Sequence, residues 1–186
     1  LVGSEMCIRD RPWDTEHPVL HHAVAELLNA AGQPIDRKQV TFGFRTAEFR
    51  ADGFYLNGKK TFLRGLNRHQ SYPYIGYAAP ESLQREDARI LQEELHCTAV
   101  RTSHYPDDPY FLQLCDEYGL YVIGETNLET HGTWQKLGAD GSDEWTLPGA
   151  RPEWRENVLA RAEAMLERDK NHPAILIWSC GNESHG

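Results

Sequence analysis

The sequence predicts an α/β fold in two parts: antiparallel strands over residues 12–60, then alternating strands and helices over residues 61–186. In the first part, short alternating segments lie between turn-forming residues, which is typical of an immunoglobulin-like β-sandwich. In the second part, apolar runs of strand length alternate with amphipathic helices, which indicates βα units on a parallel sheet. Residues 1–11 fit neither pattern, and we expect them to be a non-native leader.

The strands of the first part are short and separated by turns. The segments AAGQP, RADG and NGKK contain the Gly, Pro, Asn and Asp residues that favour turns. Three strands are too few to close a sandwich, so we interpret residues 12–60 as the end of a sandwich domain. The expected strands are Ala23–Leu28, Val40–Arg45 and Phe54–Leu56.

Helices are expected between the strands of the second part. Pro80–His96 begins with a proline that suits a first helical turn, and Asp107–Tyr118 begins with a capping Asp and stops at Gly119. Pro152–Lys170 repeats apolar residues at helical spacing. The expected buried strands are Thr61–Leu66, Thr98–Arg101, Leu120–Ile123 and Ala174–Ser179.

Four strands are visible in residues 61–186, where eight would close a (β/α)8 barrel of roughly 250 residues. A doubly wound sheet fits the strand count, but no G-x-G-x-x-G follows the first strand. A polar cluster follows each apolar run, as at the carboxyl-terminal rim where barrel active sites assemble. The sequence therefore predicts the N-terminal half of a TIM (β/α)8 barrel. The clusters are Asn67-Arg68-His69, Ser103-His104-Tyr105, Glu125-Thr126-Asn127 and Gly181-Asn182-Glu183.

Composition excludes several classes of protein. The net charge of −9 argues against a nucleic-acid binder, which would show a basic face. No apolar run approaches the roughly 18 residues of a membrane span. The four cysteines lie far apart without a C-x-x-C pair, which argues against a disulfide framework or a zinc ribbon. Since the N-terminus also lacks the apolar core of a signal peptide, we expect a cytoplasmic protein.

Two carboxylate clusters are candidates for chemistry. Glu183 follows a buried strand directly after Asn182, a position typical of either a catalytic acid or a surface loop. Glu129 and His131 lie two residues apart, so in an extended chain both side chains point to one side and can share a cation. A hard cation such as Mg²⁺ prefers oxygen ligands. Glu125 is either a further partner of that site or a satisfied strand-end charge.

Two histidines follow different strands of the same sheet. A single histidine is more often structural than functional, but His69 and His104 both lie in polar clusters with Arg68 and Arg101 nearby. We interpret them as rim donors to a polyhydroxylated ligand.

Four motifs occur in a fixed order: LRGLNRH (63–69), AVRTSHYP (99–106), ETNLETHG (125–132), and DKNHP with WSCGNES (169–173 and 178–184). With them, residues 12–186 resemble the bacterial β-galactosidases of glycoside hydrolase family 2. The resemblance implies that Glu183 is the general acid/base and that Asn182 contacts the 2-hydroxyl side of the sugar. It also implies that Glu129, His131 and Glu183 bind an active-site Mg²⁺.

The same resemblance assigns the remaining rim residues. His69 and His104 match histidines that contact the galactosyl group, and Arg101 matches an arginine that supports the catalytic carboxylates. A retaining glycosidase needs two carboxylates about 5–5.5 Å apart. In the family the nucleophilic Glu lies on a later barrel strand, so we expect this chain to be a fragment without it, inactive by itself.

The expected activity is hydrolysis of terminal non-reducing β-D-galactosyl residues, in a β-galactoside such as lactose, with retention of configuration. The alternatives are a β-glucuronidase or β-mannosidase of the same family, or a non-catalytic carbohydrate-binding half-barrel. The resemblance further implies a homo-oligomeric full-length enzyme. Neither a nucleic acid nor a membrane is an expected partner.

Overall fold

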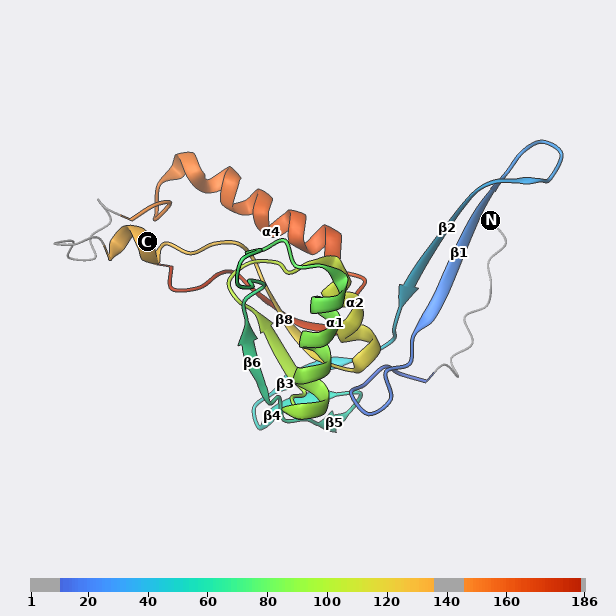
Figure 1. Cartoon of the computed structure of the whole chain (residues 1–186), viewed down its shortest axis with the longest axis horizontal. Helices are drawn as coiled ribbons and strands as arrows, with labels where there is room; N and C mark the ends of the chain where they lie inside the picture. The colour runs from blue at the N-terminus through green and yellow to red at the C-terminus, as the bar shows by residue number, and fades with distance from the viewer. Residues whose placement is uncertain (1–10, 136–145, 185–186) are drawn as a thin grey trace.

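The computed structural model describes residues 11–135 and 146–184, so residues 1–10 of the expected leader lie outside the described part (Figure 1). Its strands form an antiparallel pair β1-β2, an antiparallel sheet β3-β4-β5 and a parallel sheet β6-β7-β8-β9. Their bounds are β1 His21–Leu28, β2 Pro34–Phe42, β3 Ala47–Arg50, β4 Gly53–Leu56, β5 Lys59–Lys60, β6 Gly65–Arg68, β7 Ala99–Thr102, β8 Tyr121–Glu125 and β9 Ile175–Ser179.

Helices connect consecutive strands of the parallel sheet. α1 lies between β6 and β7, α2 between β7 and β8, and α4 between β8 and β9. Each strand pairs in parallel with the next along the chain, which is the order predicted for half of a barrel. The helices are α1 Glu81–Arg89, the π-helical turn η1 Ile90–Glu94, α2 Pro109–Tyr118, α3 His131–Trp134, the 3-10 turn η2 Pro152–Trp154 and α4 Arg155–Asp169.

The ends of α2 follow from its sequence. The carboxylate of Asp108 caps the helix by accepting a hydrogen bond from the Tyr110 amide at 2.8 Å, and Gly119 ends it in the left-handed region at φ 71°. The expected cap was Asp107, one residue earlier, but that carboxylate is instead buried against Arg68. Figure 1 shows α2 beside α1.

β6 and β2 begin several residues from the positions that the sequence predicts. β6 begins at Gly65, which pairs with Ala99 of β7, rather than at position 61. The two strands approach so closely that a Cβ on Gly65 would lie 2.0 Å from the Ala99 carbonyl oxygen. β2 begins at Pro34, before the expected Val40, and its residues from Pro34 to Thr41 are all exposed. A strand without a buried face leaves no alternating pattern in the sequence.

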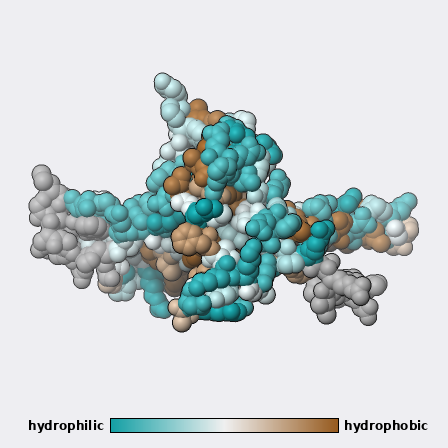
Figure 2. Space-filling view, turned by 90° about the horizontal axis from the view of Figure 1, so that it is seen from below, coloured by the Kyte–Doolittle hydropathy of each residue, from teal (hydrophilic) through white to brown (hydrophobic). Residues whose placement is uncertain are grey.

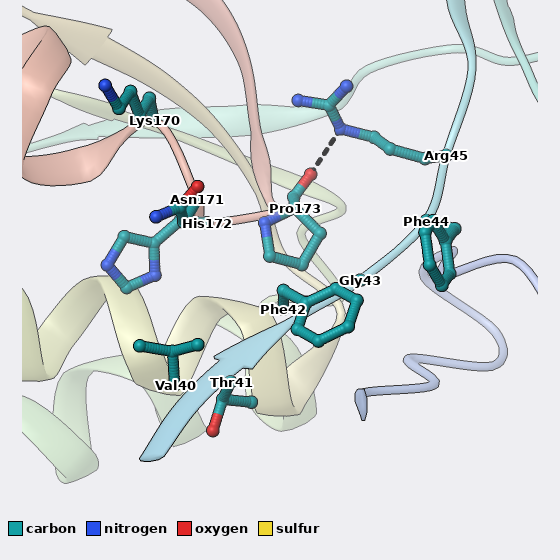
Figure 3. Close-up of a pocket in the computed structure, with 10 residues that line it drawn as sticks. All are labelled: Val40, Thr41, Phe42, Gly43, Phe44, Arg45, Lys170, Asn171, His172 and Pro173. Atoms are coloured by element: carbon teal, nitrogen blue, oxygen red, sulfur yellow. Dashed lines mark hydrogen bonds between the residues drawn. The ribbon is translucent and has the colours of Figure 1, made fainter. Parts of the chain in front are cut away.

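The β1–β2 hairpin projects from the body of the molecule (Figure 1). It carries exposed apolar side chains among polar ones, and Figure 2 shows brown and teal residues interspersed along it. At its base, Arg45 donates from Nε to the Pro173 carbonyl oxygen at 2.5 Å and also bonds the Ile175 carbonyl. This contact borders a pocket of about 380 Å³ between residues 40–45 and 170–173 (Figure 3).

One hydrophobic core joins the two parts of the chain. Trp13 is fully buried, packs edge-on against Tyr121 of β8, and donates from its indole nitrogen to the Asp116 carbonyl oxygen at 2.8 Å. Phe54 and Leu56 of β4 belong to the same buried cluster. The remaining members of the cluster come mainly from α2 and the parallel strands. Residues that precede β6 in the sequence therefore pack against the parallel sheet.

No helix within residues 11–135 and 146–184 combines the length and the apolar character needed to cross a membrane. Three of the four cysteines lie in the described part, and Cys97, Cys115 and Cys180 are all free thiols. Burial raises the pKa of the Cys115 thiol well above its ordinary value, so this side chain stays neutral in the core.

Candidate functional site at the carboxyl ends of the parallel strands

The carboxyl ends of β6 to β9 meet at one edge of the parallel sheet. His69 follows β6 directly, His104 lies two residues beyond β7, and Glu125 is the last residue of β8. Asn182 and Glu183 come shortly after β9. The predicted polar clusters therefore lie at a common rim, as in a (β/α)8 barrel.

The imidazole rings of the two rim histidines are in edge-to-face contact. The ring centroids of His69 and His104 are 5.1 Å apart with an interplanar angle of 82°, and Tyr105 approaches His69 at 6.1 Å. The structure thus brings together two side chains that lie 35 positions apart in the sequence. Both imidazoles can exchange hydrogen bonds with a hydroxylated ligand.

Glu125 is fully buried and connects three parts of the rim. Its Oε1 lies 2.7 Å from Nδ1 of His104, and its Oε2 accepts from Nε of Arg101 at 2.7 Å and from the Ser179 hydroxyl at 2.8 Å. Burial alone would raise the pKa of Glu125, but the hydrogen bonds from Ser179, His104 and Arg101 lower it below its ordinary value. The carboxylate is therefore ionised at neutral pH.

A chain of hydrogen bonds runs from Arg101 to the second carboxylate cluster. Nη2 of Arg101 donates to Oδ1 of Asn182 at 2.9 Å, and Nδ2 of Asn182 donates to Oε1 of Glu129 at 3.0 Å. Because Oδ1 accepts from a guanidinium and Nδ2 donates to a carboxylate, the orientation of this amide is fixed.

Glu129, His131 and Glu183 form the cluster at the end of this chain. Each offers one ligand atom, and these three atoms lie within 4.8 Å of one another. Nδ1 of His131 is 2.6 Å from Oε2 of Glu183 and 3.9 Å from Oε1 of Glu129. Two carboxylate oxygens and one imidazole nitrogen suit a divalent cation that keeps waters in its remaining positions, as Mg²⁺ does.

Backbone pairing between two loops assembles this cluster. The Asn182 amide donates to the Leu128 carbonyl oxygen at 2.9 Å, and Glu129 forms an isolated bridge with Asn182. Gly181 makes the approach possible: its φ is 141°, and a Cβ there would lie 2.4 Å from the Leu128 oxygen. The glycine before Asn182 is thus required for the two loops to meet.

Arg68 lies beneath the rim in a buried polar network. Its guanidinium donates to Asp87 at 2.8 Å, to Asp107 at 2.6 Å and to Gln84 at 2.6 Å, and it stacks 3.8 Å from the ring centroid of Phe111. The network ties the end of β6 to α1 and to the loop before α2. It supports His69, the next residue along the chain.

Burial raises the pKa of Asp107 to about 6, although Arg68 acts in the opposite direction. The folded chain therefore binds this proton more tightly than the unfolded chain does, whose Asp has an ordinary pKa near 3.8. The resulting stabilisation is complete at low pH and is lost as the pH rises through about 6.

Sequence reasoning named the rim residues but did not predict their partners. Ser179 received no role, although its hydroxyl donates to Glu125. Arg68 is expected close to the rim histidines, whereas its side chain is buried below them. In the sequence, only the position of a polar residue at the end of an apolar strand marks it as a rim residue. That position does not indicate which side chain it will bond.

Family models match most of the chain. The model described as glycosyl hydrolases family 2, TIM barrel domain, matches residues 47–186, and a second model, described as glycosyl hydrolases family 2, matches residues 5–45. Among curated relatives, a β-galactosidase of Priestia megaterium is 49% identical over 94% of this chain and 17% of its own length. A β-galactosidase of Streptococcus thermophilus is 43% identical over 96% of this chain and 17% of its own length.

Solved structures of related glycosidases have the same fold. A β-glucuronidase of Bifidobacterium dentium, complexed with coumarin-3-O-glucuronide, aligns with a TM-score of 0.77 and 33% identity over 92% of this chain and 26% of its own. A β-glycosidase of Bacteroides vulgatus aligns with a TM-score of 0.74 and 30% identity over 94% of this chain and 21% of its own.

The chain thus spans about one sixth of the length of these curated relatives. The predicted fold class, half of a TIM barrel after the end of a β-sandwich domain, is confirmed by the family models and the structural neighbours. The match to the barrel model covers well over half of the sequence, and the predicted family is confirmed with it. The chain belongs to glycosyl hydrolase family 2.

Proposed function

We propose that this chain forms part of the active site of a β-galactosidase, which hydrolyses terminal non-reducing β-D-galactosyl residues with retention of configuration. The observation that carries the proposal is the position of Glu183, beyond the end of β9, beside Asn182 and 2.6 Å from His131. The identity of 42–49% to several curated β-galactosidases over more than nine tenths of the chain supports it.

In this proposal, Glu183 protonates the leaving glycosidic oxygen and then removes a proton from the attacking water. His69 and His104 contact the galactosyl hydroxyls, and Arg101 fixes the Asn182 amide for the sugar. The nucleophilic carboxylate is supplied from outside these 186 residues.

Glu129, His131 and Glu183 would hold the Mg²⁺ that we also propose. A cation there would supply positive charge next to the Glu183 carboxylate. The chain's own contribution is to keep the three ligand atoms within 4.8 Å of one another through the Leu128–Asn182 pairing.

Reciprocal chimeras would test the proposed substrate. We would replace the aligned segment of the P. megaterium β-galactosidase by this chain, giving the galactosidase chimera, and do the same in the B. dentium β-glucuronidase. The galactosidase chimera is expected to release aryl galactoside with the β-anomer as first product, and the glucuronidase chimera is expected to lose glucuronide hydrolysis. Activity of the second chimera alone would favour a glucuronidase, which is the activity named for several structural neighbours.

Replacing Glu129 by Gln in the galactosidase chimera is expected to weaken Mg²⁺ binding, because one of the two carboxylate ligands is lost. The Mg²⁺ concentration at half-maximal activity should rise about tenfold or more, equivalent to ~1.4 kcal/mol. The matched control is Glu117→Gln on α2, whose exposed carboxylate accepts from Gln113 at 2.8 Å. Equal Mg²⁺ curves for the two variants would contradict the proposed metal site.

A homo-oligomeric full-length enzyme and a cytoplasmic location are also proposals. Light scattering of the full-length protein would test the first, and fractionation of the source cells would test the second.

A further inference from the structure

We propose that Glu125 is the positioning residue of this site, because its buried carboxylate fixes one proton on Nδ1 of His104 and the orientation of Arg101. The inference rests on the proposed function for its kinetic consequence, but its structural content concerns only residues of this chain. Glu125 touches neither the proposed metal ligands nor, in this assignment, the sugar.

The argument begins with burial. Glu125 has no exposed surface at the end of β8, and its backbone amide donates to Oγ1 of Thr102 on the neighbouring strand at 2.9 Å. A carboxylate without water needs donors for both oxygens. The structure supplies them from His104, Arg101 and Ser179, which lie on two other segments of the rim.

The two oxygens have different partners. Oε2 accepts from the Arg101 guanidinium and the Ser179 hydroxyl, whereas Oε1 bonds, among the residues that the structure describes, only Nδ1 of His104 at 2.7 Å. An ionised carboxylate can only accept hydrogen bonds, so Nδ1 must carry a proton. In the neutral imidazole the other nitrogen, Nε2, then holds a lone pair and accepts.

This tautomer matters for recognition of a sugar. Nε2 of His104 makes no hydrogen bond within the described part of the chain, so it is available to a ligand. As an acceptor it bonds a substrate hydroxyl that acts as donor. With the opposite tautomer, the same edge of the ring would present an N–H instead.

Glu125 acts on a second rim residue through Arg101. The guanidinium is held by Glu125 through Nε and donates from Nη2 to Oδ1 of Asn182 at 2.9 Å. Asn182 in turn donates to Glu129 at 3.0 Å. One carboxylate therefore sets the direction of an imidazole and, through the guanidinium, of an amide.

Glu125→Gln separates this role from packing because the two side chains have the same size. The amide oxygen is expected to stay with Arg101, which is always a donor, so the amide NH₂ faces Nδ1 of His104. Two donors cannot face each other, and the ring proton should therefore move from Nδ1 to Nε2.

The experiment is ¹⁵N NMR of the complete 186-residue chain with labelled histidine at pH 9, above the pKa of an ordinary imidazole. The His104 signals are assigned by their loss in His104→Gln. We expect a protonated Nδ1 in the unmodified chain and in the control Glu117→Gln, and a protonated Nε2 in Glu125→Gln. A protonated Nε2 in the unmodified chain would overturn the proposal whether or not the variant folds.

Kinetics of the galactosidase chimera give the second readout. Glu125→Gln is expected to lower kcat/KM for an aryl galactoside by about 10- to 100-fold. Among the monodeoxygalactosides, the loss should be clearly smaller for the one that lacks the hydroxyl bonded to Nε2. An equal loss for every analogue would overturn the role in recognition. Failure of the unmodified chimera to hydrolyse any galactoside would instead refute the proposed function, and the NMR result would stand by itself.

Discussion

Glu183→Gln in the galactosidase chimera is expected to lower kcat for an alkyl galactoside by about 10²- to 10⁴-fold, the usual contribution of general acid–base catalysis. Glutamine keeps the size of the side chain but cannot deliver a proton to the leaving oxygen. A dinitrophenyl galactoside, whose leaving group needs little protonation, should lose much less activity in its first step. The measurement, at saturating Mg²⁺, is kcat for the alkyl galactoside and kcat/KM, which reports the first step, for the dinitrophenyl galactoside.

The control for this prediction is Glu156→Gln, an exposed residue in the first turn of α4. It should leave both rates unchanged. If Glu183→Gln lowers the rates of hydrolysis of the two substrates equally, Glu183 does not act by protonating the leaving group. If neither rate falls, the assignment of the acid/base residue is wrong.

Arg68→Met is expected to lower the free energy of unfolding by about 3–5 kcal/mol, the range for removing one partner of a buried ion pair. Methionine fills much of the same space, but it leaves Asp107 buried without its cation and Gln84 without its donor. Urea denaturation of the chain, followed by tryptophan fluorescence, measures the change.

The loss should also depend on pH. Burial raises the pKa of Asp107 to about 6 even with Arg68 present, and Arg68 lowers it. Without the guanidinium the folded-state pKa rises further, so the variant stays neutral at Asp107 over a wider range. The destabilisation is therefore expected to be larger at pH 8, where the unfolded state favours the charged form, than at pH 5.

The control is Arg89→Met on α1, a partly exposed arginine paired with Glu86, Glu93 and Glu94. Ion pairs of this kind contribute little. A large, pH-independent loss in Arg68→Met would point to lost packing on Phe111 rather than to the buried charges.

The sequence predicted three strands of the parallel sheet well, of which β7 and β8 are mostly buried. β7, β8 and β9 all begin within one residue of the expected positions, since an apolar run of strand length has few other interpretations. The helix α2 was also recognisable from its ends, although its cap lies one residue later than expected.

The exposed strand β2 and the π-helical turn η1 could not be predicted in the same way. β2 lies on the projecting hairpin without a buried face, so its first six residues carry no strand pattern. The expected helix Pro80–His96 is α-helical only to Arg89 and then widens into the π-helical turn η1. Local residue preferences alone determine neither the start of β2 nor the π-helical turn.

For the site, the sequence supplied the residues and the fold supplied their partners. Glu129 and His131 could be paired from their spacing, and the family resemblance joins Glu183 to them; the structure places the ligand atoms of all three within 4.8 Å of one another. The three donors to Glu125 could not, because they come from positions 24 and 21 residues before it and 54 residues after it. Only strand register brings them to one carboxylate.

Trp13 has a consequence for folding during synthesis. Its indole bonds the Asp116 carbonyl, a partner made 103 residues later. At typical elongation rates of 5–20 residues per second, the ribosome needs about 5–20 s to produce that partner. Over that interval Trp13 can contact Phe44 and Asn57, which are made earlier, but not the Asp116 carbonyl or Tyr121. The contact between Trp13 and the base of the parallel sheet therefore forms late in synthesis.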